Sequence, residues 1–314
     1  MSELHLKTVF RPLGHTTPLI DGTVTPNGFT MDYENVEPLI AAFRRMVRAS
    51  EFDICELAVT TYICAKSYGK KFTAVPIFPA RMFHHGAIVV NKNAGIHAPK
   101  DLEGKRVGVG RGYTVTTGVW IRGILAQQYG VDLSKVTWVL SGDEHVEEYK
   151  APPNVVSIEA GKKIDEMVIA GELAGAVNMA IDHPDVQPLI PNAMDAAFAA
   201  LRERGLYPIN HTVAVRDELL EAHPDLAKNI FNAFAEAKRV YVEKLRSGAI
   251  DNPTKLDEQN KKVMEITGDP LPYGVEPNRS VLDALMDTAA KQGIIKAPLS
   301  FGQIFAEGTL DLVG

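Results

Sequence analysis

The run DLEGKRVGVG at residues 101–110, with the segment that follows it to Tyr129, decides the fold class of this 314-residue chain. It predicts a turn, a short buried strand over residues 106–109, a polar loop over 110–118 and then a helix, because apolar residues recur there at the spacing of one helical face. A loop rich in Gly and Thr between a strand and a helix leaves backbone N–H groups pointing to one place, and the helix dipole adds partial positive charge. This loop therefore favours a carboxylate or a phosphate as its ligand.

Three threonines of that loop, Thr114, Thr116 and Thr117, are candidates for the N-cap of the helix and for binding a carboxylate. The local signal is weak by itself, since most strand–loop–helix connections bind nothing. The third glycine of a dinucleotide fingerprint is missing at its spacing, and the chain has no Gly-Lys-Ser/Thr phosphate loop. The residues alone leave anion binding open.

Strand patterns alternate with helix patterns along the chain, which is typical of an α/β protein. The length suits two domains of about 150 residues each. We expect residues 1–90 and 205–314 to form a discontinuous lobe 1 and residues 91–204 to form lobe 2. Ligands favour clefts between domains, so the cleft between the two lobes is the expected binding place.

Composition excludes several classes of function. The net charge of -6 argues against a nucleic-acid partner, which would favour a basic face. No apolar run approaches the roughly 18 residues of a membrane helix, so no membrane partner is expected. The N-terminal residues lack the basic and apolar regions of a signal peptide, which favours the cytoplasm. Cys55 and Cys64 are expected to be buried free thiols, because two cysteines in a chain of this size are no disulfide framework.

Polar residues near the ends of predicted strands are the candidates for a site. Arg11 follows the first strand, and ligands of open α/β sheets collect at such carboxyl ends. Glu56 stands between apolar neighbours, where a carboxylate is costly unless it is paired or protonated. His211 stands at the head of an apolar strand, where a histidine is more often structural than catalytic. Surface exposure of Glu56 remains the alternative.

Three further candidates come from the middle of the chain. Arg81 and His85 lie just before a run of small and β-branched residues, and they supply a carboxylate-binding guanidinium and a group that exchanges protons near neutral pH. A solvated loop is the alternative for both. Asn178 ends another predicted strand. No metal site is expected, because neither His-x-His nor His-Glu-x-x-His occurs in the sequence.

Two sets of motifs resemble known proteins. Residues 96–109 resemble the start of the second lobe in type 2 periplasmic-binding-protein folds, which implies two lobes, each a mixed sheet flanked by helices. Four other segments resemble the 4,5-dihydroxyphthalate decarboxylase family, and the similarity runs from about Tyr33 to near the C-terminus: PIFPARMFHH (76–85), GVWIRGIL (118–125), YPINHTV (207–213) and DPLPYGVEPNR (269–279).

The resemblance implies a decarboxylase that needs no cofactor and acts on a small hydroxylated aromatic carboxylic acid of the phthalate type. It implies that His211 or His85 is the general acid and that Glu56 tunes the imidazole or takes a proton from a ring hydroxyl. Carboxylates of the substrate would then be held by the arginines, the loop threonines and the strand-end amide: Arg81, Arg11, Thr114, Thr116, Thr117 and Asn178. The alternative is a non-catalytic solute-binding protein for a small carboxylate. The expected partner is a small-molecule carboxylate, and assembly into a homo-oligomer is left open.

Overall fold

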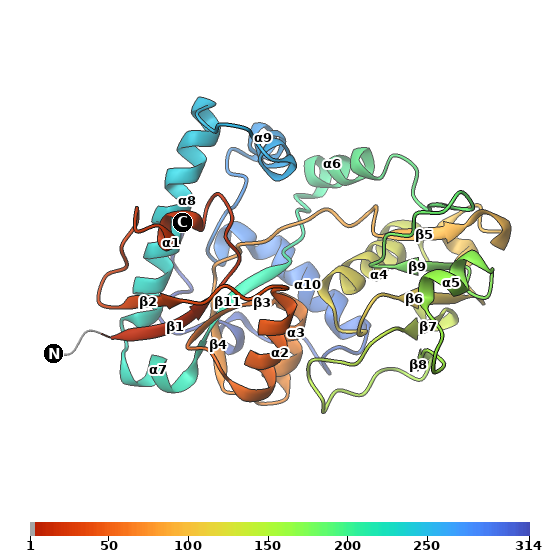
Figure 1. Cartoon of the computed structure of the whole chain (residues 1–314), viewed down its shortest axis with the longest axis horizontal. Coiled ribbons are helices and arrows are strands. Elements are labelled where there is room, and N and C mark those ends of the chain that lie inside the picture. The colour runs from red at the N-terminus through yellow and green to blue at the C-terminus, as the bar shows by residue number, and fades with distance from the viewer. Residues whose placement is uncertain (1–3) are drawn as a thin grey trace. The chain divides into compact units, whose positions relative to one another are not determined.

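The computed structural model of the chain describes residues 4–314 (Figure 1). Its contacts divide the chain into two compact units. Unit 1 contains the residues up to Arg81, His211–Leu282 and Leu299–Gly314, and unit 2 contains Met82–Asn210 and Asp283–Pro298. The predicted lobe boundaries at 90/91 and 204/205 differ from these, because a strand over residues 88–91 belongs to the sheet of unit 2. The first three residues, which the predicted lobe 1 includes, lie outside the described residues.

Unit 1 is built on a five-stranded mixed sheet with the order β2-β1-β3-β11-β4. Strands β2, β1 and β3 are parallel, whereas β11 is antiparallel to both β3 and β4. All five residues of β3 are buried, as is usual for a central strand covered on both faces. The strands are β1 (His5–Val9), β2 (Thr30–Tyr33), β3 (Ile54–Ala58), β4 (Phe72–Val75) and β11 (His211–Arg216).

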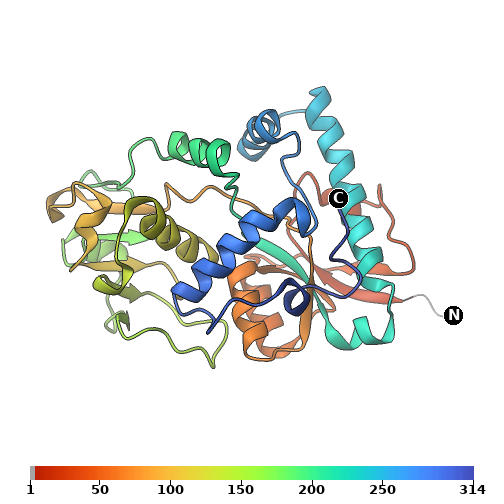
Figure 2. The same cartoon turned by 180° about the vertical axis from the view of Figure 1, so that it is seen from behind.

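Helices flank this sheet, with α2 and α3 packed against β3 and α8 against β4. The long helix α8 places an apolar stripe inward and ends at Gly248, whose φ of 73° suits a left-handed C-cap (Figure 2). The helices are α1 (Thr17–Ile20), α2 (Ile40–Ala49), α3 (Val59–Ser67), α7 (Asp217–Ala222), α8 (Leu226–Ser247), α9 (Lys255–Thr267), the 3-10 helix η4 (Glu276–Asn278) and α11 (Phe301–Ile304). Helix α10 (Arg279–Lys291) begins in unit 1 and continues into unit 2.

Unit 2 contains a six-stranded mixed sheet with the order β10-β5-β9-β6-β7-β8. Four of the six strands, β9, β6, β7 and β8, are parallel to one another, and β5 is antiparallel to β9. The strands are β5 (Ile88–Asn91), β6 (Arg106–Val109), β7 (Thr137–Leu140), β8 (Val155–Ser157), β9 (Gly175–Val177) and β10 (Val186–Pro188). The predicted α/β class, with a mixed sheet in each part, is confirmed.

The helices of unit 2 include α4, which follows the loop after β6 as predicted. Helix α4 starts at Thr116 with Val115 as its N-cap and no capping side chain, so the prediction of a threonine N-cap is wrong. The helices are α4 (Thr116–Tyr129), α5 (Ile164–Ile169) and α6 (Ala193–Arg204), with the 3-10 helices η1 (Lys92–Ala94), η2 (Pro99–Leu102) and η3 (Leu133–Lys135).

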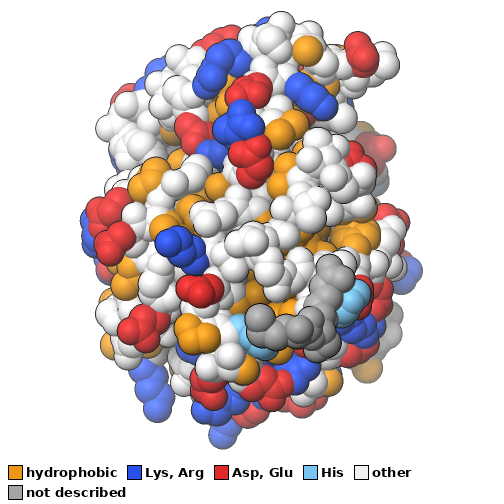
Figure 3. Space-filling view, turned by 90° about the vertical axis from the view of Figure 1, so that its left-hand side faces the viewer, with side chains coloured by type: hydrophobic (Ala, Val, Ile, Leu, Met, Phe, Trp, Pro, Cys, Tyr) orange, Lys and Arg blue, Asp and Glu red, His pale blue; other side chains and the backbone are white. Residues whose placement is uncertain are grey.

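Surface charge is mixed in sign on the face shown in Figure 3, where acidic and basic side chains are interspersed. Cys55 and Cys64 are both buried free thiols. No helix within residues 4–314 is both long enough and apolar enough to span a membrane.

Candidate functional site

The sheet of unit 1 brings its candidate residues to one edge. Because β1 and β3 are parallel and β11 is antiparallel to β3, the carboxyl ends of β1 and β3 lie at the same edge as the start of β11. Arg11 follows β1, Glu56 lies in β3, and His211 is the first residue of β11. In the register, His211 is opposite Ala58 and Val213 is opposite Glu56, so Glu56 and His211 are diagonal neighbours on one face of the sheet.

Glu56 and His211 form a buried hydrogen-bonded pair. The Nδ1 of His211 donates to Oε1 of Glu56, and the backbone N–H of Arg11 donates to Oε2 at 2.7 Å. The side chain of Glu56 is fully buried, and the ring of Phe43 meets the imidazole edge-on at 5.1 Å between centroids. Burial acts to raise the pKa of Glu56, but the hydrogen bond and charge of His211, with the charge of Arg11, outweigh burial and hold that pKa below its ordinary value.

This pair has a definite chemical capacity. An ionised Glu56 that accepts from Nδ1 fixes the orientation of the imidazole and keeps the proton on that nitrogen. The other ring nitrogen, Nε2, is then the atom that can deliver or accept a proton. Two hydrogen bonds therefore offset the free-energy cost of burying the charged carboxylate of Glu56, a cost that its apolar neighbours in the sequence had indicated.

Arg81 lies at the same edge of unit 1 but is bound to a loop of its own unit. Its Nη2 donates to the carbonyl of Pro272 at 3.2 Å and to the side-chain oxygen of Asn278, and its guanidinium lies 5.7 Å from the ring of Phe78. The guanidinium therefore anchors the segment that contains Pro272 and Asn278. The predicted contact of Arg81 with a substrate carboxylate stays a prediction.

His15, which follows β1, is a structural residue of unit 1. It is buried, and its Nε2 donates to the carbonyl of Pro79 at 2.9 Å. Burial lowers the pKa of His15 to about 4. The imidazole is therefore neutral at pH 7 and contributes no charge at the edge of the sheet.

In unit 2 the predicted anion loop already holds a carboxylate, that of Glu144. The hydroxyl of Thr114 donates to Glu144 at 2.6 Å, and the backbone N–H groups of Tyr113 and Thr114 donate to the same carboxylate, the latter at 3.2 Å. A Cβ added to Gly112 would lie 2.6 Å from that carboxylate, so a side chain at this position would displace the carboxylate of Glu144. The loop thus holds a carboxylate of its own unit, and its predicted binding of a substrate carboxylate stays a prediction.

Arg122 on α4 supports this loop from inside the unit. Its fully buried guanidinium donates to the carbonyl of Tyr113 at 2.6 Å and to Gln292 at 2.8 Å, and it lies 3.8 Å from the ring centroid of Tyr113. Neither Glu144 nor Arg122 was a candidate in the sequence. The position of Glu144 shortly after β7 was a usable signal, whereas Arg122 lies in the motif GVWIRGIL (118–125), which indicated the family and gave this residue no role.

The remaining candidates of unit 2 contact the protein itself. His85 is buried and its Nε2 donates to Gln128 at 3.0 Å, and burial lowers the pKa of His85. Neighbouring His84 donates to Asn210 at 2.9 Å, and burial lowers its pKa to about 4. Asn178, with a φ of 58°, donates from Nδ2 to the carbonyl of Gly110 at 2.9 Å. These contacts favour positioning roles, and the catalytic role of His85 and the binding role of Asn178 stay predictions.

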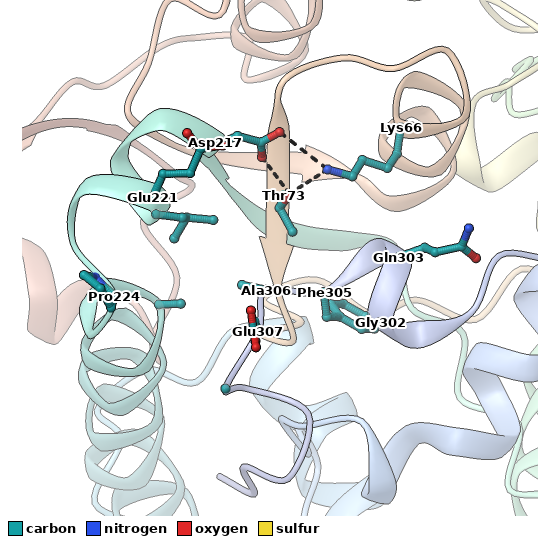
Figure 4. Close-up of a pocket in the computed structure, with 13 residues that line it drawn as sticks. Lys66, Thr73, Asp217, Glu221, Pro224, Gly302, Gln303, Phe305, Ala306 and Glu307 are labelled. Atoms are coloured by element: carbon teal, nitrogen blue, oxygen red, sulfur yellow. Dashed lines mark hydrogen bonds and ion pairs between the residues drawn. The ribbon is translucent and has the colours of Figure 1, made fainter.

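A separate cavity of about 730 Å³ lies in unit 1, at the opposite end of β11 from His211 (Figure 4). Thr73 donates to Asp217 at 2.6 Å, and Lys66 donates to Thr73 at 2.6 Å and to the carbonyl of Phe72 at 3.2 Å. Lys66, Thr73 and Asp217 are therefore hydrogen-bonded to their own unit at this cavity. Among residues 4–314, no group of three or more His, Cys, Asp or Glu side chains is placed to hold a metal ion.

Comparison with known proteins gives a family and a fold. The family model described as "NMT1/THI5 like" matches residues 80–244. Over 328 aligned residues the chain is 31% identical to a protein from Comamonas testosteroni named 4,5-dihydroxyphthalate decarboxylase, and the alignment covers 99% of each chain.

Two solved structures share the fold. The periplasmic aliphatic sulphonate binding protein SsuA from Escherichia coli is 11% identical, with a TM-score of 0.55 and coverage of 98% of this chain and 99% of the other. The desulfurization enzyme DSZB is 12% identical, with a TM-score of 0.54 and coverage of 98% of both chains. At such identities these likenesses show the periplasmic-binding-protein type of fold alone.

Proposed function

We propose that this chain, which belongs to the 4,5-dihydroxyphthalate decarboxylase family, removes CO2 from a small hydroxylated aromatic acid of the phthalate type. The family resemblance that the sequence motifs predicted is thereby confirmed. The structural observation that carries the proposal is the buried pair of Glu56 and His211, which supplies an oriented imidazole at the edge of the sheet in unit 1.

Decarboxylation of such an acid needs a general acid that supplies one proton and groups that bind the substrate carboxylates. A ring hydroxyl pushes electron density toward the carbon that bears the carboxylate, and a general acid protonates that carbon. The bond to the carboxylate then breaks, its electron pair restores the aromatic ring, and CO2 leaves. Groups that hold the carboxylates and exclude water lower the barrier further.

We assign the proton to His211. With Nδ1 held by Glu56, the imidazole presents Nε2 for transfer of a proton to the ring carbon, and Glu56 keeps the ring in that orientation. His85 is the second candidate for this role, but the burial that lowers its pKa disfavours a charged imidazole. We therefore favour His211 as the general acid.

Binding of the carboxylates is the second part of the proposal. Arg81 and Arg11 are the candidate cations of unit 1. Thr114, Thr116, Thr117 and Asn178 are the candidates of unit 2, supported by the carboxylate that Thr114 binds in the structure.

We further propose the cytoplasm as the location, supported by the two cysteines, which are free thiols rather than a disulfide.

The test is an assay of CO2 release from 4,5-dihydroxyphthalate by the purified protein, with and without a chelator. Phthalate, which lacks the ring hydroxyls, is the control compound because it cannot push electrons to the reacting carbon. Release of CO2 from the hydroxylated acid that His211→Gln abolishes supports the proposal. A rise in melting temperature with ligand but no CO2 would support a binding protein instead, and the decarboxylase proposal would be withdrawn.

A further inference from the structure

Tyr273 belongs to the segment DPLPYG (269–274), to which the sequence assigned no role. The segment follows α9, and its backbone is fixed on both sides. The N–H of Tyr273 donates to the carbonyl of Gly314 at 2.9 Å, and the N–H of Gly274 donates to the carbonyl of Pro76 at 2.8 Å. Gly274 has a φ of 100°, and an added Cβ would lie 2.2 Å from the carbonyl oxygen of Leu312. The ring of Tyr273 is therefore held in one place.

The hydroxyl of Tyr273 is an exception to the usual pairing of buried polar groups. The residue is fully buried, and its hydroxyl oxygen makes no hydrogen bond to any of residues 4–314. A phenylalanine would fill the same space without burying an unpartnered hydroxyl, so the hydroxyl gives the folded protein nothing that a phenyl ring would lack. A buried hydroxyl without a partner in the folded chain points to a partner that is not part of the chain.

Tyr273 is connected to the candidate site of unit 1 through its neighbour Pro272. Pro272, its neighbour in sequence, accepts a hydrogen bond from Arg81, and the ammonium of Lys238 lies 5.3 Å from the ring centroid. Burial, Asp269 and Glu56 raise the pKa of Tyr273, and Arg81 lowers it. The hydroxyl thus keeps its proton at neutral pH, and Glu56 and Arg81 lie within electrostatic range of it.

We propose that the Tyr273 hydroxyl donates a hydrogen bond to an anionic oxygen of the bound substrate, either a carboxylate or a ring oxygen. This inference rests on the proposed decarboxylase function and adds a substrate-binding residue to Glu56 and His211. The ligand supplies the acceptor that the folded chain lacks.

Tyr62 on α3 provides a matched control. It is also a fully buried tyrosine of unit 1, but its hydroxyl donates to the carbonyl of Ile304 and accepts from the N–H of Ala74 at 3.0 Å. Removing that hydroxyl leaves a buried N–H and a buried carbonyl unpaired, which lowers the melting temperature. It removes nothing that the substrate is proposed to touch.

The experiment compares Tyr273→Phe and Tyr62→Phe with the wild type in melting temperature and in steady-state decarboxylation of 4,5-dihydroxyphthalate, assayed well below the lowest melting temperature. We expect Tyr273→Phe to melt at or above the wild-type temperature and to lose about tenfold or more in kcat/KM. Tyr62→Phe should show the opposite, a lower melting temperature with kcat/KM within about twofold of the wild type.

Each other outcome overturns the inference. If Tyr273→Phe keeps the wild-type kcat/KM, the hydroxyl touches no substrate, while CO2 release by the wild type leaves the decarboxylase function standing. If Tyr273→Phe melts several degrees lower, the hydroxyl has a structural partner. If the wild-type protein releases no CO2, the proposed function fails and this inference fails with it.

Discussion

The hydroxyl of Thr114 donates a 2.6 Å hydrogen bond to the carboxylate of Glu144, so the loop that leads into α4 is filled by an anion from its own unit. Two backbone N–H groups converge on the same carboxylate. The arrangement stabilises the loop, because hydrogen bonds to a charged acceptor are stronger than neutral ones.

We expect Glu144→Ala to lower the melting temperature by several degrees, because the donors of Tyr113 and Thr114 lose an acceptor worth about 1–3 kcal/mol. Sodium acetate should restore part of that loss by supplying a carboxylate to the vacated donors, and it should leave the wild type unchanged. Thermal melts with and without acetate measure both effects. Glu203→Ala, at an exposed position of α6 in the same unit, is the control. A variant that melts like the wild type would show that Glu144 does not hold the loop.

The second prediction concerns the pair of Glu56 and His211. Glu56→Gln keeps the size of the side chain but removes the charged acceptor that orients the imidazole, so we expect kcat to fall about 100-fold with a small change in KM. Steady-state kinetics on the purified variant measure this. Glu51→Gln makes the same chemical change at an exposed position before β3, where Glu51 pairs with Arg45, and should keep the wild-type kcat. A kcat of Glu56→Gln equal to that of the wild type would remove Glu56 from the reaction.

The structure also shows how far sequence reasoning reaches. The helical and strand periodicities predicted the positions of the elements. The apolar neighbours of Glu56 in the sequence indicated that its carboxylate is buried. What the sequence could not supply was which histidine Glu56 contacts, because Glu56 and His211 are 155 residues apart and only the antiparallel register of β3 and β11 places them diagonally. The hydrogen bond of Arg81 to Pro272 was also beyond the reach of the sequence, since the two residues lie 191 positions apart, and the predicted contact of Arg81 with a substrate carboxylate stays a prediction.

A third prediction follows from the buried histidines. Burial lowers the pKa of both His15 and His84 to about 4 from an ordinary value of 6.5. Between those values the unfolded chain binds protons at these positions that the folded chain does not. The contribution of these two neutral histidines to the free energy of unfolding is therefore fully present above pH 6.5 and is lost as the pH falls toward 4. The free energy of unfolding then changes by up to about 1.4 kcal/mol per pH unit for each histidine.

Urea denaturation at several pH values between 7 and 5 measures that slope. His15→Gln removes one of the buried histidines that produce this slope, so its free energy of unfolding should depend less steeply on pH than that of the wild type, even if its stability at pH 7 is lower. His97→Gln, which changes an exposed histidine, should keep the wild-type slope. Equal slopes for His15→Gln and the wild type would mean that His15 binds its proton equally well in both states.

The last prediction separates the two roles of Arg81. Its guanidinium donates to the carbonyl of Pro272 and to Asn278, and a lysine ammonium cannot reproduce that planar geometry. Arg81→Lys should therefore lower the melting temperature by several degrees, and it should raise KM for 4,5-dihydroxyphthalate if the arginine also holds a substrate carboxylate. Asn278→Ala removes the protein partner but keeps the charge, so it should lower the melting temperature with a smaller change in KM. An unchanged KM in Arg81→Lys would limit Arg81 to anchoring the loop. A lysine cannot make the two parallel hydrogen bonds of a guanidinium to a carboxylate, so its substitution for a substrate-binding arginine would weaken the enzyme–substrate complex.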